Sequence, residues 1–142
     1  MFENENHKIE IIDGIMYYTC KCKIFSKEIV LEGIKERLAM SNNEDQYIVC
    51  DMLSVGYWPA SGRNEFGKKE HQACVKVSGV ILKSNLIITL LNWLLIFFHI
   101  DIPVKIFSNK EEALAWVLKQ KEEDENRENQ QIEDITKTSY LS

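Results

Sequence analysis

The fold of this 142-residue chain is decided by one apolar stretch, Tyr47-Ile48-Val49-Cys50-Asp51-Met52-Leu53. The stretch has the length of a β-strand, and a strand that is apolar on both faces is typical of a parallel sheet covered by helices. A turn, Ser54-Val55-Gly56-Tyr57-Trp58-Pro59, then leads into Ala60-Ser61-Gly62. In α/β folds, functional groups gather where such strands end. We therefore expect any functional surface to lie on this loop.

The residues before this strand predict a hairpin and a helix. Asp13-Gly14 separates two apolar arms, residues 8–12 and 15–24, and Asp-Gly is a strong signal for a two-residue hairpin turn. Ser26 is placed to cap the helix that follows, with Glu28 in its first turn. The core face of that helix is predicted from three apolar residues at helical spacing, which are Val30, Ile34 and Leu38.

The residues after the central strand alternate between helical and extended patterns. Residues 61–74 are weakly helical, and residues 75–82 are β-branched and apolar, as in a buried strand. Residues 104–107 form a further short strand, and Ser108 with Glu111 makes a capping box for a helix through Leu118. This order predicts an α/β fold with a mixed, mostly parallel sheet and right-handed crossovers.

The C-terminal residues differ in composition from the rest. From Glu122 onward the chain is rich in Glu, Asp, Asn and Gln, which is typical of a solvated extension or of disorder. We therefore predict a single domain over residues 1–121 and a polar, acidic extension over residues 122–142. The apolar residues by which this extension could dock on the domain are Ile132, Ile135, Tyr140 and Leu141.

Composition excludes several classes of function. The net charge of −5 and the pI near 5.3 argue against binding to nucleic acid or to acidic membranes. The N-terminus has no basic segment followed by an apolar core, so we expect no secretory signal and a cytoplasmic location. We expect the four cysteines to be reduced and buried, because they lie within apolar stretches. We interpret Cys20 and Cys22 as core residues and not as metal ligands, and we expect no metal or cofactor.

The most apolar segment, residues 85–99, is too short for a membrane helix and is interrupted by polar residues. As a helix it would carry two apolar stripes. The core face comprises Ile87, Leu91, Leu94 and Phe98. The second stripe comprises Leu86, Leu90, Trp93 and Phe97. The second stripe must meet another part of the chain, a second copy of the chain or an apolar ligand.

Four residues near the central loop are candidates for a partner-binding or switch site. Asp51 ends the central strand, and its carboxylate either serves function or caps the next turn. Trp58, beside Tyr57, belongs either to an exposed contact patch or to the core. Ser61 is placed to cap a helix or to carry a phosphate at its positive end, and Arg63 follows it. No phosphate-binding loop or nucleophile elbow is present in the sequence. The hypothesis of an enzyme would therefore depend on Asp51 and His71 alone.

Two stretches carry a family resemblance. Ile48-Val49-Cys50-Asp51-Met52-Leu53-Ser54-Val55, continuing to Ala60-Ser61-Gly62, resembles the strand, acidic residue and Ser-Gly helix start of the SpoIIAA-like, or STAS, anti-sigma-factor antagonists. Val104-Lys105-Ile106-Phe107-Ser108-Asn109-Lys110-Glu111-Glu112-Ala113-Leu114-Ala115-Trp116 resembles the closing strand and helix of small bacterial STAS/SEC14-like proteins. In phosphorylated members the modified serine corresponds to Ser61, but Pro59 and Ala60 replace the preceding Asp and Ser.

The resemblance implies a SpoIIAA-like fold and a non-enzymatic protein-interaction or regulatory domain without a working phosphoserine switch. Its partner would be another protein or a second copy of the chain, with a homodimer expected. Relatives of this fold bind lipids, so the alternative is a SEC14-like carrier for a small apolar ligand held by the second stripe of residues 85–99.

Overall fold

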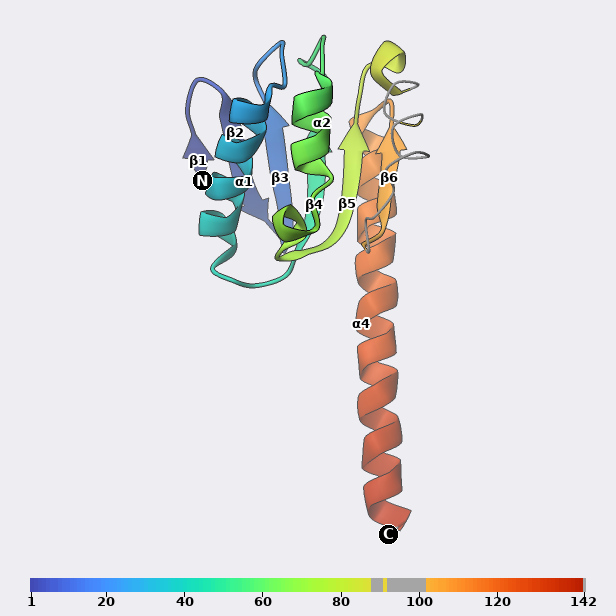
Figure 1. Cartoon of the computed structure of the whole chain (residues 1–142). Coiled ribbons are helices and arrows are strands. Elements are labelled where there is room, and N and C mark those ends of the chain that lie inside the picture. The colour runs from blue at the N-terminus through green and yellow to red at the C-terminus, as the bar shows by residue number, and fades with distance from the viewer. Residues whose placement is uncertain (88–90, 92–101, 142) are drawn as a thin grey trace.

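The computed structural model describes residues 1–87, 91 and 102–141, and these build a six-stranded mixed sheet in the order β1-β2-β3-β4-β5-β6 (Figure 1). The strands are β1 (Phe2–Glu3), β2 (His7–Ile12), β3 (Ile15–Cys20), β4 (Gln46–Asp51), β5 (Val75–Ile81) and β6 (Val104–Phe107). The first three strands pair antiparallel, and β3 to β6 pair parallel. The predicted α/β fold with a mixed, mostly parallel sheet is therefore confirmed. The short strand β1 was not expected from its polar sequence.

The predicted hairpin is present. Asp13 and Gly14 have φ angles of 51° and 79°, and two positive φ angles in succession are what a type I′ turn requires. The register pairs His7 with Cys20 and Ile12 with Ile15. The second arm was predicted to reach residue 24 but ends at Cys20, because residues 21–26 turn away to meet the loop after β4.

Helices cover both faces of the sheet, as Figure 1 shows. On one face lie α1 (Lys27–Ser41) and α2 (Ala60–Phe66), and on the other lies α4 (Lys110–Leu141). Each face has its own apolar cluster. Val30 and Trp58 belong to the first, whereas Ala113 and Val117 of α4 belong to the second. The central strand β4 contributes to both clusters through Ile48 and Val49, as expected of a strand that is apolar on both sides.

The start of α1 follows the prediction, but its core face does not. The Ser26 side chain accepts a hydrogen bond from the backbone N–H of Ile29 at 3.4 Å, and Glu28 lies in the first turn. The buried residues are Val30, Gly33, Arg37 and Ser41. Val30 is buried and the half-buried Ile34 packs against the first apolar cluster, whereas Leu38 is only half-buried. The true core face is therefore shifted toward Gly33 and Arg37 from the predicted one.

The helix predicted over residues 61–74 is shorter than expected. Helix α2 ends at Phe66, and Gly67 closes it through hydrogen bonds to the carbonyls of Arg63 and Glu65. A separate 3-10 helix, η1 (Lys69–Gln72), then leads to Cys74, which has a φ of 62° and precedes β5. The helix breaks because glycine is a poor helix former and a common helix end.

Helix α4 begins one residue later than the capping box predicted. Asn109, not Ser108, accepts the hydrogen bond, from the backbone N–H of Glu112 at 2.9 Å. The helix continues through the predicted extension to Leu141, so those residues are helical and not disordered. Its first turns pack on the sheet, whereas its C-terminal half projects beyond it (Figure 1). Ile132 and Ile135 are exposed and do not dock on the described residues.

Much of the segment predicted as a two-striped helix lies outside the described residues, including Leu90, Trp93 and Phe97. Ser84 to Ile87 are helical. Leu86 is buried in the first apolar cluster, so it meets another part of the chain. Leu91, predicted on the core face, is exposed. Among the described residues, no helix is both long enough and apolar enough to span a membrane.

Candidate functional site

The loops that follow β3 and β4 are joined into one platform. The backbone N–H groups of Gly56 and Tyr57 donate to the carbonyl of Lys23, at 2.7 and 3.0 Å, and the N–H of Phe25 donates to the carbonyl of Tyr57 at 3.0 Å. Ile24 and Tyr57 thus form a parallel bridge outside the sheet. Because these hydrogen bonds fix the backbone of both loops, the side chains on the platform are held in place.

Three large apolar side chains on this platform face solvent. Tyr57 is 60% exposed, Ile24 is 54% exposed and Leu53 is 38% exposed. We call these three residues the loop-end surface. They lie at the carboxyl ends of β3 and β4, where α/β folds place binding groups. Grouped apolar side chains on a rigid backbone indicate a contact surface, whereas single exposed apolar residues are common everywhere.

Asp51 has a structural role at the base of this surface. Its Oδ1 accepts a hydrogen bond from the backbone N–H of Leu53 at 3.0 Å. The carboxylate therefore caps the turn after β4, which is the structural alternative considered for it, and it positions Leu53 on the loop-end surface.

Trp58 is a core residue and not part of an exposed patch. It is 2% exposed, and its ring packs edge-on against Phe25 and Phe66, with ring centroids 5.2 and 5.3 Å apart. Of the two alternatives for Trp58, the core is therefore correct, while its neighbour Tyr57 is the exposed aromatic residue. Trp58 anchors the loop from below, so that Tyr57 is presented outward.

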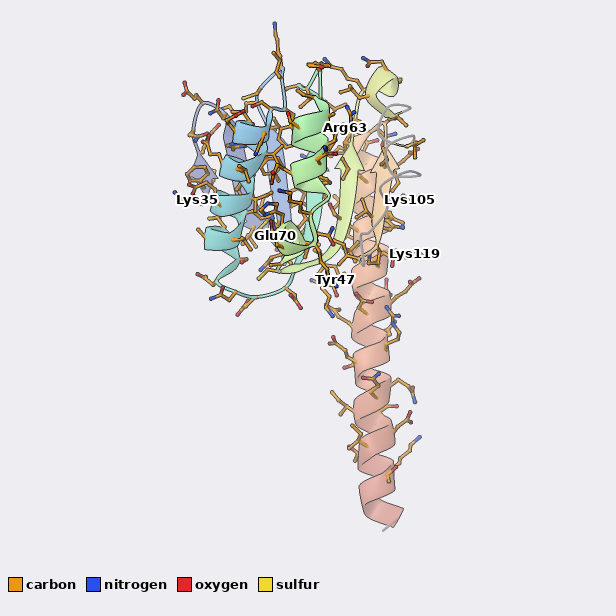
Figure 2. All side chains as sticks on the ribbon, in the orientation of Figure 1. Lys35, Tyr47, Arg63, Glu70, Lys105 and Lys119 are labelled. Atoms are coloured by element: carbon orange, nitrogen blue, oxygen red, sulfur yellow. The ribbon has the colours of Figure 1, made fainter. Side chains whose placement is uncertain are left out.

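Ser61 and Arg63, two candidates for the partner-binding or switch site, both lie on α2. The N-cap of α2 is Pro59, which has no capping side chain, and Ser61 is an exposed residue of the first turn. The N-cap interpretation of Ser61 is therefore wrong, because the helix begins earlier, at Ala60. Arg63 turns back toward the loop, where its Nη1 donates to the carbonyl of Trp58 at 2.5 Å. Figure 2 shows Arg63 on α2.

An ion-pair cluster fixes the other end of α2. The buried carboxylate of Glu65 lies 2.8 Å from Lys68 Nζ, 3.0 Å from His71 Nε2 and 3.7 Å from Lys27 Nζ. The hydrogen bond from Lys68, together with that from His71, holds the pKa of Glu65 below its usual value. The cluster ties α2 to η1 and to the start of α1, so it stabilises the helical layer behind the loop-end surface.

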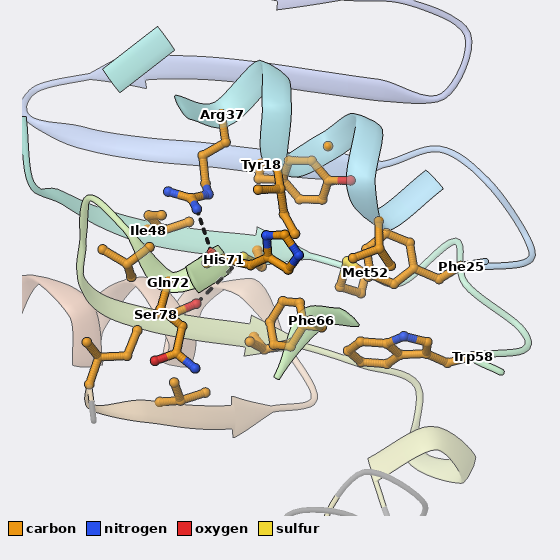
Figure 3. A pocket seen from close by; sticks show the side chains of 18 residues that line it. Tyr18, Phe25, Arg37, Ile48, Met52, Trp58, Phe66, His71, Gln72 and Ser78 are labelled. Atoms are coloured by element: carbon orange, nitrogen blue, oxygen red, sulfur yellow. Dashed lines mark hydrogen bonds between the residues drawn. The ribbon is translucent and has the colours of Figure 1, made fainter. Parts of the chain in front are cut away.

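A partly open cavity of about 70 Å³ lies between this helical layer and the sheet (Figure 3). Its walls are mainly apolar, and polar side chains enter it from α1, η1 and β5, namely Arg37, His71, Gln72 and Ser78. Sequence reasoning missed Arg37, although its place seven residues after Val30 put it on the core face of α1. It also missed Ile24, which was assigned to a strand.

The four cysteines differ in burial. All four are free thiols. Cys20 and Cys50 are buried, whereas Cys22 and Cys74 are half-buried, so the prediction of burial holds for two of them. Burial raises the pKa of both buried thiols to about 11, which keeps them protonated and unreactive. No group of three or more metal-binding side chains occurs in the part of the chain that the structure describes.

Comparison with known proteins gives one family and one fold. A family model described as "Domain of unknown function (DUF7793)" matches residues 9–121. A protein of the DUF3478 family from Shewanella loihica PV-4, solved with a SpoIIAA-like fold, resembles the chain with a TM-score of 0.55 and 14% identity. The similarity covers 82% of this chain and 98% of that one. The SpoIIAA-like fold is thereby confirmed. No curated protein matches the chain.

Proposed function

The chain belongs to the DUF7793 family, and from this family and its SpoIIAA-like fold we propose that it is a non-enzymatic, STAS-like interaction domain of the cytoplasm. Its partner is another protein, and the contact is made by the loop-end surface. The observation that carries this proposal is the exposure of Tyr57, Ile24 and Leu53 on loops whose backbones are fixed by hydrogen bonds. A fixed backbone favours binding because little conformational entropy is lost when the partner docks.

Tyr57 is the central contact of the proposed interface. Tyrosine is enriched among the residues that dominate binding energy, since its large ring packs well and its hydroxyl can still form a hydrogen bond. Its backbone is held on both sides, by the hydrogen bond from its N–H to Lys23 and by the one that its carbonyl accepts from Phe25. Ile24 and Leu53 flank it as apolar contacts.

The proposed domain works without a phosphoserine switch at Ser61. Pro59 and Ala60 precede Ser61, where the phosphorylated STAS proteins that it resembles have Asp and Ser. Pro59 has a fixed φ and no side-chain donor or acceptor. Ser61 remains exposed beside the loop-end surface, so it contributes to the contact surface as an ordinary polar residue.

A lipid carrier of SEC14 type is the second candidate, and the size of the cavity argues against it. Pockets for drug-sized ligands measure about 300–1,000 Å³, whereas the cavity beneath α1 and α2 measures about 70 Å³. This volume is too small to enclose a whole lipid chain. Leu86 belongs to the second stripe, which would hold such a ligand, but its side chain is buried in the first apolar cluster.

Site-specific photo-crosslinking in the native host tests the proposal. A photoreactive phenylalanine analogue replaces Tyr57 in one strain and Lys35, an exposed residue on α1, in the control strain (Figure 2). We expect the Tyr57 site to trap one protein reproducibly, identified by mass spectrometry, and Ile24→Asp to abolish that product. The same set of products from both sites would refute a specific interface. A product of twice the chain's own mass would instead identify a second copy as the partner.

A further inference from the structure

The buried side of α1 has residues that a packed core would not select. Helix α1 presents Gly33 and Arg37 to the sheet, whereas leucine and isoleucine are the usual residues of a packed core. Glycine within a helix costs about 1 kcal/mol of helix propensity relative to alanine. At Gly33 a Cβ would lie 2.8 Å from the hydroxyl of Tyr18. The glycine therefore lets the side chains of Tyr18 and His7 approach α1 closely, and Arg37 places a charge on the same buried face of the helix.

The cavity between α1 and the sheet has mainly apolar walls and one buried positive charge. Apolar side chains such as Ile48, Val80 and Phe66 enclose it, and Arg37 enters it from α1 (Figure 3). Among the described residues that line it there is no aspartate or glutamate. Glu65, the nearest buried carboxylate of the helical layer, pairs with Lys68, Lys27 and the Nε2 of His71. No negative charge on the lining residues thus balances Arg37.

The charge on Arg37 is buried and has only neutral partners. Its Nη1 donates to the carbonyl of Ala73 at 2.8 Å and its Nη2 to the carbonyl of His71 at 2.9 Å. Within the described part of the chain, no carboxylate forms an ion pair with it. Burial lowers the pKa of Arg37, yet a guanidinium stays protonated in proteins. A buried cation without a counter-ion is unfavourable, and an anion bound beside it would relieve that cost.

We propose that this cavity binds a small organic monoanion, a carboxylate with a short branched apolar group. Arg37 would hold the carboxylate, because a guanidinium offers parallel donors to its two oxygens. Ile48 and Val80 would enclose the apolar group. A single cation matches a single negative charge, and a volume of about 70 Å³ excludes long acyl chains. This ligand site is independent of the proposed protein interface.

Titration of the intact protein with isobutyrate, followed through the methyl NMR signals of Ile48 and Val80, tests the site. Isobutyramide serves as the neutral probe of the same shape, and sodium chloride keeps the ionic strength constant. We expect saturable shifts at both residues with a Kd of about 1 mM for isobutyrate, and binding of isobutyramide at least about tenfold weaker. Absence of saturable shifts at these methyls, or equal binding of the amide, would overturn the proposal.

The Arg37→Gln variant tests whether Arg37 is responsible for the binding of isobutyrate. Arg37→Gln removes the charge and keeps a hydrogen-bonding side chain, and we expect it to bind isobutyrate no better than isobutyramide. Circular dichroism establishes whether this variant folds, since Arg37 also holds η1. A folded Arg37→Gln protein that binds isobutyrate as tightly as the wild type would refute the role of Arg37. Where the variant does not fold, the comparison of the two probes on the wild-type protein decides the proposal.

Discussion

At the scale of single residues, His7 illustrates how burial controls protonation. Its ring is fully buried, its Nδ1 lies 2.5 Å from the hydroxyl of Tyr18, and its Nε2 has no hydrogen-bond partner. Burial lowers the pKa of His7, although Glu32 and Glu36 oppose this shift, and burial also raises the pKa of Tyr18. Both groups are therefore neutral, and the tautomer of His7 determines which of them donates the hydrogen bond.

Folding stability should consequently depend on pH through His7. Because its pKa is lower in the folded state than the unfolded value of 6.5, the unfolded chain binds the proton first as pH falls. The contribution of the neutral His7 to the free energy of unfolding is complete above about pH 6.5. It decreases as the pH falls below this value, by at most about 1.4 kcal/mol per pH unit. Urea unfolding between about pH 7.5 and 5 measures this slope. His7→Gln should show a smaller slope, and identical slopes would contradict the assignment.

Gly62 marks the closest approach between α2 and the loop before α1. A Cβ at this position would overlap the backbone carbonyl oxygen of Phe25 and lie 3.2 Å from Trp58 Nε1. Gly62→Ala should lower the free energy of unfolding by about 1–3 kcal/mol, although alanine is the better helix former. Ser61→Ala, at the exposed neighbouring position, should change it by less than about 0.5 kcal/mol. Thermal unfolding compares the two variants, and a Gly62→Ala protein as stable as wild type would show that the two backbones are not in tight contact.

At the scale of secondary-structure elements, α4 consists of a packed part and a projecting part. Ala113 and Val117 are buried against the sheet, and Gly79 of β5 lets the helix approach closely. Further along, Tyr47 of β4 donates a hydrogen bond from its hydroxyl to Asp124 at 2.9 Å (Figure 2). Residues 125–138 are all exposed, and contacts within the helix stabilise them, such as the ion pair between Lys121 and Glu125.

We therefore propose that the folding unit ends close to residue 121 and that the rest is an extension. Truncation after Arg127 keeps the hydrogen bond between Tyr47 and Asp124, and residues 128–138, which it removes, are exposed. The free energy of unfolding should change by less than about 0.5 kcal/mol. The matched control, truncation after Leu114, removes the buried Val117 and should destabilise the domain strongly. Chemical denaturation of both proteins measures this, and a large loss on the first truncation would show that the extension belongs to the folding unit.

Sequence patterns predicted the elements that depend on local chemistry. The Asp13-Gly14 dipeptide correctly predicted the hairpin turn, and Ser26 correctly predicted the start of the next helix. The strand of residues 104–107 was also located correctly. The predictions were wrong where two neighbouring residues can both play the same structural role. Ser108 and Asn109 can both cap a helix, and only the packing of α4 on β5 selects Asn109. The polar extension looked disordered because its helicity depends on continuing a helix that is already formed.

Features of the candidate site depended on contacts that no local pattern encodes. Trp58 and Tyr57 are adjacent aromatic residues in one turn, and only the packing of Phe25 and Phe66 decides which of them is buried. Nothing in its residue type singles out Arg37 as a core residue, because charged side chains are seldom buried. Its burial depends on the carbonyls of His71 and Ala73, more than thirty residues away in the sequence. The SpoIIAA-like fold was therefore accessible from sequence, whereas the exposure of Ile24 and the burial of Arg37 were not.

At the scale of the whole molecule, the two ends of the sheet have different surfaces. The loop-end surface lies where β3 and β4 finish, and the projecting half of α4 leaves from the opposite end (Figure 1). The cavity lies between them, under α1 and α2. A partner on the loop-end surface would therefore leave α4 accessible. In the proposed account, the sheet is a rigid frame that presents Tyr57 at one end.

The affinity of the purified chain for the protein that crosslinks at Tyr57 is the most direct test of this account. Isothermal titration calorimetry compares the wild type with Tyr57→Asp and with the control Lys35→Asp, and circular dichroism verifies that both variants are folded. A charge in the apolar centre of an interface should weaken binding at least about tenfold, whereas the control should change Kd less than about threefold. Equal affinities for the wild type and Tyr57→Asp would contradict the proposal that the loop-end surface binds the partner.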